Sequence, residues 1–269
     1  MKKKISITIN EKTLNEIDEI IDNIYIRNRS QAIELLVSRA LGENKNAVIL
    51  AGGPEEDLKI SDNEYRLTGT INNTTLIESS IKKLKEEGFT NIYIVARHNV
   101  ITSIFNIIQN GSKYGVNIIY KEETESSGTA DSLRLIKGDI KTNFLVVYGD
   151  LFFDNINIEE LWNSHLKRKG SATLLLNVTH DPSKKGIVKL EGANILEFVQ
   201  KPKTSDIYLG FASMFIAEPE ILEYSGQSLE GNVFPVLAQK ELLRGYLSTN
   251  KIVKIHSKED LKSIKQQDL

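Results

Sequence analysis

An apolar run closed by two glycines is the first feature of the chain that could bind a ligand. Residues 46–51 read Asn-Ala-Val-Ile-Leu-Ala and are followed by Gly52 and Gly53. A short continuous apolar run is typical of a central strand in a parallel sheet that is covered on both faces. Glycines at its end let the backbone approach another group, and ligands bind at such strand ends in open α/β sheets. We therefore predict a ligand-binding turn at Gly52 and Gly53.

The loop after this turn is acidic, which is unusual for a phosphate site. It carries Glu55, Glu56 and Asp57, whereas a phosphate cradle uses free N–H groups and basic side chains. One alternative is a solvated turn with no ligand nearby. Another is a small metal site, because adjacent carboxylates suit a hard cation.

Strands and helices alternate through the rest of the chain. We expect strands at residues 46–51, 91–95, 117–120 and 144–148, a late strand at 246–255, and helices at 76–87, 100–109, 129–136 and 158–166. Such alternation implies a doubly wound parallel sheet with right-handed crossovers.

Asp150 is a second group with potential chemistry at a strand end. It follows Gly149 at the end of the apolar strand 144–148. The alternative is that Asp150 only caps the following segment. Phe152, Phe153 and Trp162 are assigned to the core rather than to a ligand platform.

The composition narrows the classes of protein. The chain has 269 residues, a formal net charge of -2 and no cysteine. We expect one large α/β domain with a small module, and disulfides, thiolate metal sites and a cysteine nucleophile are excluded. The histidines show no paired spacing, which argues against zinc. The basic start has no apolar core behind it and no run approaches a membrane span, so we expect a cytoplasmic protein with no membrane contact.

The sequence pattern of the first 43 residues predicts a small module that cannot fold alone. Residues 4–10 alternate between isoleucines and mostly polar side chains, as in a half-buried strand. Two short helices follow, with Asn10 and Asn28 as N-caps; the first is expected to end near residue 25. So short a chain cannot cover the apolar stripe that these elements leave. We therefore expect an obligate homodimer or a higher oligomer.

This module resembles the ribbon-helix-helix repressors of the Arc, MetJ and CopG type over nearly its whole length, including Asn28-Arg29-Ser30 at the start of the second helix. In that family two chains pair their strands into a ribbon that lies in the major groove of DNA. The resemblance implies DNA binding, with base contacts from the strand and a phosphate contact at the second helix. The implied DNA-binding residues are Lys4, Ser6, Thr8, Arg27, Asn28, Arg29 and Ser30. The alternative is a module that only dimerises, because acidic residues of the first helix nearly cancel the basic ones.

Residues 46 to about 261 resemble the sugar-1-phosphate nucleotidylyltransferases, which make nucleotide sugars from a nucleoside triphosphate and a sugar phosphate. The matching segments are Leu50-Ala51-Gly52-Gly53, Gly128-Thr129-Ala130, Tyr148-Gly149-Asp150, Gly186-Ile187-Val188, Phe198-Val199-Gln200-Lys201-Pro202, Gly210, and Ser228-Leu229-Glu230 with Pro235. The predicted fold class is therefore α/β: a Rossmann-like, doubly wound mixed sheet of the nucleotidyltransferase-like kind, preceded by a small dimeric ribbon-helix-helix module. The two domains are expected at residues 1–43 and 46–269.

The same resemblance implies roles for individual residues. Ala51, Gly52, Gly53, Arg66 and Gly128 would bind the nucleotide, Lys201 the sugar phosphate and Glu230 a sugar hydroxyl, and Asp150 would hold Mg²⁺ together with phosphate oxygens. The reaction is phosphoryl transfer, in which catalysis is mostly positioning and neutralisation of charge.

Several departures from the family pattern affect charged groups. Glu55-Glu56-Asp57 stands where the family has Gly-Thr-Arg, Arg66 where it has a lysine, Gln200 where it has a glutamate, and Lys254 where it has a second metal carboxylate. Loss of an arginine contact or a metal ligand removes transition-state stabilisation. We therefore predict a DNA-binding transcriptional regulator whose transferase-like domain is catalytically impaired and binds a nucleotide or nucleotide sugar or serves as an assembly surface. The alternative is an active Mg²⁺-dependent sugar-1-phosphate nucleotidylyltransferase that also binds DNA.

Overall fold

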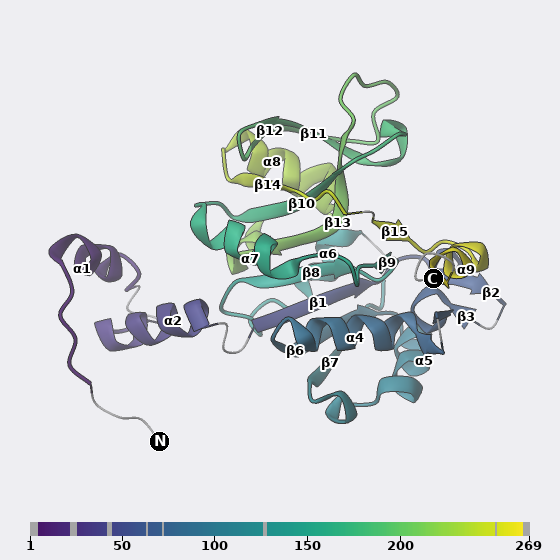
Figure 1. Ribbon diagram of the computed structural model, residues 1–269, viewed down its shortest axis with the longest axis horizontal. Coiled ribbons are helices and arrows are strands. Elements are labelled where there is room, and N and C mark those ends of the chain that lie inside the picture. The colour runs from purple at the N-terminus through teal and green to yellow at the C-terminus, as the bar shows by residue number, and fades with distance from the viewer. Residues whose placement is uncertain are drawn as a thin grey trace. The chain divides into compact units, whose positions relative to one another are not determined.

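The computed structural model describes residues 5–21, 26–41, 45–62, 64–71, 73–125, 128–250 and 252–265 (Figure 1). The chain divides into two compact units, residues 1–44 and 45–269. None of the helices within the described stretches is long and apolar enough to cross a lipid bilayer.

The first unit contains two helices, α1 (Glu11–Asp18) and α2 (Arg29–Leu41). Both begin where predicted, because Asn10 Oδ1 accepts the Thr13 N–H at 2.8 Å and Asn28 Oδ1 accepts the Gln31 N–H at 3.0 Å. Helix α1 ends earlier than predicted, and the predicted end near residue 25 lies outside the described residues.

The strand predicted for residues 4–10 is absent from the described part of the first unit. Residues 5–10 form no ladder there, and Ile5 is 75% exposed. A strand exists only through pairing with a neighbour, and this unit offers no second strand among its described residues. Lys4 lies outside the described residues.

The described residues of the second unit form a nine-stranded mixed sheet in the order β10-β14-β12-β11-β13-β8-β1-β6-β7. Its strands are β1 (Lys45–Ala51), β6 (Phe89–Ala96), β7 (Asn117–Glu122), β8 (Phe144–Tyr148), β10 (Ala172–Val178), β11 (Gly186–Glu191), β12 (Asn194–Gln200), β13 (Leu209–Ala217) and β14 (Leu243–Leu247). The neighbours β8, β1, β6 and β7 run parallel, and β13 pairs antiparallel with β8. The strands β1, β6, β7 and β8 confirm the four that the sequence predicts before residue 150, and their C-terminal ends lie at one edge of the sheet.

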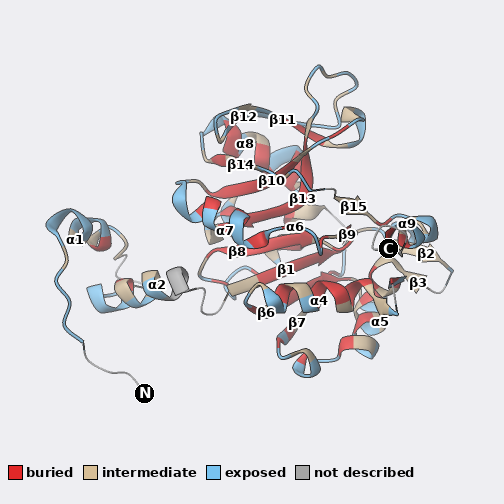
Figure 2. Cartoon of the chain, in the orientation of Figure 1, coloured by how far each residue is buried: buried red, intermediate tan, exposed pale blue. Residues whose placement is uncertain are grey.

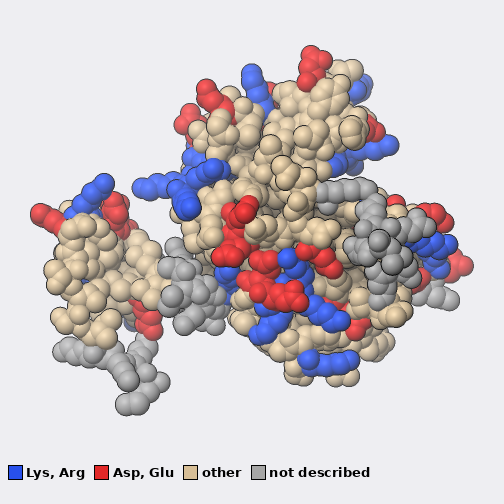
Figure 3. Space-filling view, in the orientation of Figure 1, with Lys and Arg blue, Asp and Glu red and all other residues tan. Residues whose placement is uncertain are grey.

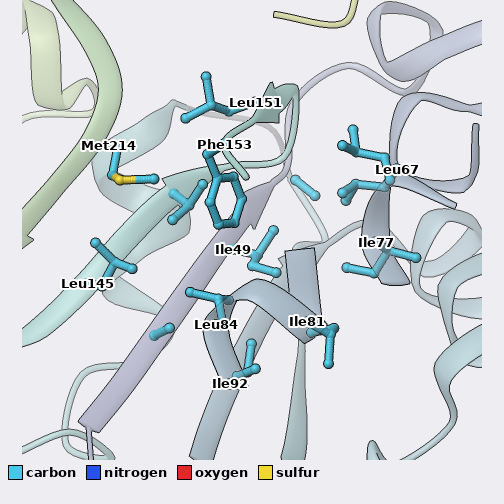
Figure 4. Close-up of a cluster of buried hydrophobic side chains, with 14 of the residues drawn as sticks. Ile49, Leu67, Ile77, Ile81, Leu84, Ile92, Leu145, Leu151, Phe153 and Met214 are labelled. Atoms are coloured by element: carbon cyan, nitrogen blue, oxygen red, sulfur yellow. The ribbon is translucent and has the colours of Figure 1, made fainter. Parts of the chain in front are cut away.

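Hydrophobic cores cover both faces of this sheet because successive side chains of a strand point to opposite faces. Ile49 of β1 belongs to the core that contains side chains of α4, α5, α7 and α9, whereas Val48 and Leu50 belong to the core that contains side chains of α6 and α8. The helices are α4 (Leu76–Glu86), α5 (His98–Ile108), α6 (Thr129–Arg134), α7 (Ile158–Lys167), α8 (Phe234–Gln239) and α9 (Lys258–Lys265). Figure 4 shows Ile49 in the first core with Leu84 of α4 and Leu145 of β8. The central strands are almost wholly buried (Figure 2).

Short elements surround the strand ends. They are α3 (Glu55–Leu58), the 3-10 turn η1 (Arg66–Thr68), the π-helical turn η5 (Leu229–Val233), and the ladders of β2 (Lys59–Ser61) with β3 (Glu64–Tyr65), β4 (Thr70–Ile71) with β5 (Thr74–Thr75), and β9 (Leu151–Phe152) with β15 (Val253–Lys254). The single late strand predicted for residues 246–255 is therefore wrong, since that segment is divided between β14 and β15. Acidic and basic side chains are interspersed on the face of this unit seen in Figure 3.

The three aromatic residues that the sequence analysis assigns to the core, Phe152, Phe153 and Trp162, lie in it or against it. Phe153 and Trp162 are buried in the core on the α4 side of the sheet, and Phe152 packs against that core in a partly buried position. Trp162 lies edge-on to Phe89, with ring centroids 5.5 Å apart.

Candidate active site

A pocket opens at the C-terminal ends of β1 and β8, the sheet edge where the sequence predicts a ligand. Its cavity volume is about 170 Å³, and it is open to solvent. Four predicted site residues line it: Ala51, Gly52, Arg66 and Asp150. The other lining residues are Leu50, Leu58, Tyr65, Leu67, Val100, Tyr148 and Gly149. The walls therefore combine apolar side chains and glycines with one guanidinium and one carboxylate.

The Gly52-Gly53 turn is fixed by two side chains that the sequence did not single out. The Gly53 N–H donates to Glu123 Oε2 at 2.8 Å, and Arg97 Nε donates to the Gly53 carbonyl at 2.9 Å. Gly53 has a φ of 114°, which favours glycine. A Cβ on Gly52 would lie 2.8 Å from Glu123 Cδ, so only glycine fits beside this carboxylate.

Glu123 is buried at the end of β7, where it also accepts a short hydrogen bond from the Ser132 hydroxyl. The signal in the sequence is an acid directly after a predicted strand, at the same sheet edge as the glycines. That signal is weak because Glu122 stands beside it, and only the fold shows which of the two turns inward.

Asp150 lies just beyond β8 and lines the pocket. Its Oδ1 is buried and has no hydrogen-bond partner within the described part of the chain. Its Oδ2 lies 3.7 Å from Lys254 Nζ and 4.0 Å from His256 Nε2. A buried polar atom without a partner is costly and rare, which sets Oδ1 apart from most buried oxygens.

Arg66 begins the 3-10 turn η1 and lines the same pocket. Its Nε is also buried without a hydrogen-bond partner among the described residues. A guanidinium is the side chain best suited to phosphate oxygens. Arg66 and Asp150 therefore place one guanidinium and one carboxylate in the pocket lining, and each has one buried atom that no described residue binds.

The acidic loop does not face the pocket as a cluster of free carboxylates. It forms α3, in which Glu55 accepts hydrogen bonds from the Tyr65 hydroxyl (2.6 Å) and Asn99 Nδ2 (3.0 Å), and Glu56 pairs with Lys59 (2.9 Å). The hydrogen bonds from Tyr65 and Asn99 lower the pKa of Glu55. Burial, together with Glu55, raises the pKa of Tyr65 to about 12. The loop thus braces Tyr65 in the pocket wall.

Glu230 stands beside the pocket through its contact with Tyr148. This carboxylate is buried on η5 and accepts hydrogen bonds from the Tyr148 hydroxyl (2.6 Å) and Thr129 Oγ1 (2.7 Å). Burial, and then the charge of Glu230, raises the pKa of Tyr148 well above its ordinary value. Gly128 precedes Thr129 with a φ of 144°, and a Cβ there would lie 2.5 Å from the Gln227 carbonyl oxygen.

Lys201 and Lys185 lie together at the open end of the hairpin formed by β11 and β12. The Lys201 N–H donates to the Lys185 carbonyl at 2.9 Å, while the Lys201 side chain is exposed. Lys185 is partly buried, and Nζ donates to Asn177 Oδ1 at 3.3 Å. Burial, and then the nearby charge of Lys254, lowers the pKa of Lys185. Lys185, which the sequence did not single out, is thus the lysine of this pair that lies near Lys254.

The residues predicted to contact DNA lie in the first unit. Ser6, Thr8 and Ser30 are exposed, but Arg29 forms a two-pronged ion pair with Asp18, with both N–O distances 2.7 Å. Arg27 donates its backbone N–H to Gln31 Oε1 at 2.7 Å. DNA contact by these residues and by Asn28 stays a prediction, and Lys4 is outside the described residues.

Comparison with known proteins places the second unit in a family. A sequence model described as nucleotidyl transferase matches residues 46–261, which is most of the chain. The chain belongs to the nucleotidyl transferase family. Its mixed α/β fold is shared with solved structures, including a Bacillus anthracis protein described as a glucose-1-phosphate thymidylyltransferase (TM-score 0.72, 18% identity, 82% of this chain and 94% of that chain).

The relatives identified by sequence are named as sugar-phosphate enzymes. A mannose-1-phosphate guanyltransferase of Saccharomyces cerevisiae is 28% identical over 183 residues, which cover 65% of this chain and 50% of that protein. A mannose-1-phosphate guanyltransferase 2 of Candida glabrata is 29% identical over 180 residues, which cover 64% of this chain and 50% of that protein. The chain thus spans about half the length of these curated relatives.

These findings correct the predicted function. The interpretation as a DNA-binding regulator with an impaired transferase domain is wrong, because the family and the relatives point to an enzyme. The error came from treating each departure as a lost charge interaction. Glu55 and Glu56 lie outside the pocket lining, where they are bound by Tyr65 and Lys59, and Arg66 remains within the lining.

Nucleotidyl transferases typically use Mg²⁺, and Asp150 is the predicted ligand for it. Oδ1 of this residue is a suitable oxygen, but Oδ2 faces Lys254 and His256. Over the described ranges, no group of three or more His, Cys, Asp or Glu side chains could hold a metal ion. One carboxylate among several basic groups does not suit a resident divalent cation, which prefers oxygen ligands.

Proposed function

We propose that the second unit is a sugar-1-phosphate nucleotidyltransferase domain that joins guanosine monophosphate from GTP to mannose 1-phosphate or a similar sugar phosphate. The sugar phosphate and the guanyl group are those in the names of the relatives, and we infer GTP as the donor of that group. In this reaction a phosphate oxygen of the sugar phosphate attacks the α-phosphorus of GTP. The bond from that phosphorus to the oxygen bridging to the β-phosphate breaks, and pyrophosphate leaves.

One observation carries this proposal. Arg66 and Asp150 line the same pocket, and each has one buried atom, Nε and Oδ1, that no described residue binds. We assign Arg66 to the triphosphate and the Gly52-Gly53 turn to the nucleotide that lies over it. Gly128, followed by Thr129, lies beside Glu230 and borders the nucleotide, while Glu230 accepts a hydrogen bond from a sugar hydroxyl.

A thermal-shift experiment on the full chain tests this binding. GTP and GDP-mannose are added separately, with the other nucleoside triphosphates as comparison ligands. We expect GTP or GDP-mannose to raise the melting temperature, because a ligand that binds only the native state stabilises it by mass action. The absence of a shift with any nucleotide or nucleotide sugar would contradict the proposal.

We also propose that the first unit pairs with a second copy of itself. The support is its uncovered apolar surface: Ile5, Ile7 and Val37 are 75%, 52% and 49% exposed. Light scattering on the full chain should give a dimer or a larger assembly. A monomer at micromolar concentration would contradict this pairing.

A further inference from the structure

The backbone holds Lys254 beside Asp150. Strand β15 pairs antiparallel with β9, placing Lys254 opposite Leu151, the residue after Asp150. The next N–H, that of Ile255, donates to the Asp150 carbonyl at 2.7 Å. Backbone hydrogen bonds therefore fix the two strands relative to each other at this point. As a consequence, Lys254 Nζ lies 3.7 Å from Asp150 Oδ2.

Lysine and arginine side chains lie around the single negative charge of Asp150. Arg66 lines the same pocket, and Lys254 Nζ lies 3.7 Å from Asp150 Oδ2. Lys185 lies close enough to Lys254 for the positive charge of Lys254 to help lower the pKa of Lys185. A divalent cation at Asp150 would be repelled by these groups, since unit charges a few ångströms apart near a protein surface interact strongly. A phosphate group would be attracted by the same arrangement.

We propose that Lys254 is a built-in cation beside this pocket, where it pairs with the lining residue Asp150. Its ammonium neutralises Asp150 in the place that a divalent metal ion would need. The pocket then binds the phosphates of its ligand through Lys254 and Arg66, without a resident metal. The identity of that ligand rests on the function proposed above, whereas the exclusion of the metal does not.

Binding of Mn²⁺ to the protein without nucleotide tests the exclusion of the metal. Loss of the free Mn²⁺ signal in electron paramagnetic resonance measures binding to the wild type, Lys254→Asp, and Lys254→Asp combined with Asp150→Asn. We expect Lys254→Asp to bind Mn²⁺ at least tenfold more tightly than the wild type, and the double variant to lose this gain. The matched control is Lys258→Asp, because Lys258 pairs with Glu64 at 3.4 Å instead of with Asp150; it should bind Mn²⁺ as the wild type does.

Two outcomes of this experiment would overturn the inference. The first is Mn²⁺ binding by the wild type that is lost in Asp150→Asn. The second is equal Mn²⁺ affinity in Lys254→Asp and the wild type, with circular dichroism showing both to be folded. Lys254→Gln removes the charge without adding a carboxylate, and it should give an intermediate affinity if Lys254→Asp does not fold.

The affinity for GTP, measured by calorimetry in EDTA and in Mg²⁺, tests the second half of the inference. The affinity of the wild type for GTP should differ by less than about threefold between EDTA and Mg²⁺. The affinity of Lys254→Asp for GTP should be more than tenfold higher in Mg²⁺ than in EDTA. If the wild type bound GTP only with Mg²⁺, the inference that Lys254 takes the place of the metal ion would be overturned. A protein that binds no GTP in either condition would contradict the proposed function, and the Mn²⁺ measurement would still decide the role of Lys254.

Discussion

The hydroxyl of Tyr148 donates a 2.6 Å hydrogen bond to Oε1 of Glu230, and this contact joins the end of β8 to η5. Thr129 Oγ1 donates to the other carboxylate oxygen of Glu230 at 2.7 Å. Tyr148 also lines the pocket that contains Asp150. A buried carboxylate is thus held in one orientation at the side of the candidate active site.

Replacement of Tyr148 by Phe should destabilise the protein and weaken binding of GDP-mannose. It leaves Glu230 Oε1 without its donor in a buried position, and loss of one such partner costs about 1–3 kcal/mol. Urea unfolding measures the stability and calorimetry measures the binding. Tyr208→Phe is the control, because Tyr208 is exposed; equal effects of both changes would argue against the role of this hydrogen bond.

Glu123→Ala should lower the free energy of unfolding by about 1–3 kcal/mol, because the Gly53 N–H and the Ser132 hydroxyl lose their acceptor. The nucleotide-dependent thermal shift should fall as well, since the turn is no longer fixed. Glu122→Ala provides the neighbouring control, as Glu122 is exposed. If the stability of Glu123→Ala matched that of Glu122→Ala, the turn would not depend on this carboxylate.

Arg66→Met should separate ligand binding from stability. The buried Arg66 Nε has no partner among the described residues, so an apolar side chain of similar length should leave the stability of the free protein unchanged or about 1 kcal/mol higher. The GTP-dependent rise in melting temperature should be lost. Arg244→Met is the control, because Arg244 donates to the Glu241 carbonyl, outside the pocket lining. If GTP still raised the melting temperature of Arg66→Met, Arg66 would not be part of the GTP-binding site.

Glu78 should make the protein sensitive to acid. Burial acts to raise its pKa, but hydrogen bonds from the Thr75 N–H, the Tyr114 hydroxyl and the threonine hydroxyls outweigh burial and lower the pKa from 4.5 to about 2. A carboxyl group whose pKa is lower in the folded protein than in the unfolded chain stabilises the fold at pH values above the pKa of the unfolded chain. This contribution, roughly 2–3 kcal/mol, is present above pH 4.5 and is lost as the pH falls from 4.5 towards 2.

The Glu78→Gln variant tests this pH dependence. Urea unfolding at pH 6 and at pH 3 should show a smaller loss of stability in the variant than in the wild type, because the amide does not titrate. Glu86→Gln changes an exposed glutamate of the same helix and should behave as the wild type does. An unchanged loss in Glu78→Gln would show that other groups dominate the acid response.

The central strands could be predicted from the sequence because the signal lies within each segment. β1 and β8 are continuous apolar runs closed by glycine, and α4 begins at Thr75 with a side chain that caps its first turn. The residues Ala51, Gly52, Arg66 and Asp150 were brought to one pocket as expected. A family pattern read along the chain was enough for these positions.

The parts that were missed depend on contacts between distant segments. Glu123 binds Gly53 across 70 residues of sequence, and no local pattern tells it apart from Glu122. The acidic residues 55–57 were interpreted as a loss of charge complementarity, but Tyr65 and Asn99 bind Glu55 only once the fold brings them together. Residues 5–10, in which Ile5 and Ile7 are exposed, find no partner strand among the described residues, so their alternating pattern does not produce a strand there.

Release of pyrophosphate by the purified full chain is the measurement that tests the account most directly. With GTP and mannose 1-phosphate present together, phosphorus NMR should show equal amounts of pyrophosphate and GDP-mannose, and neither should form when one substrate is omitted. Arg66→Met should abolish this turnover. No product with any of the four nucleoside triphosphates, paired with mannose 1-phosphate or glucose 1-phosphate, would contradict the assignment of this domain as an active nucleotidyltransferase.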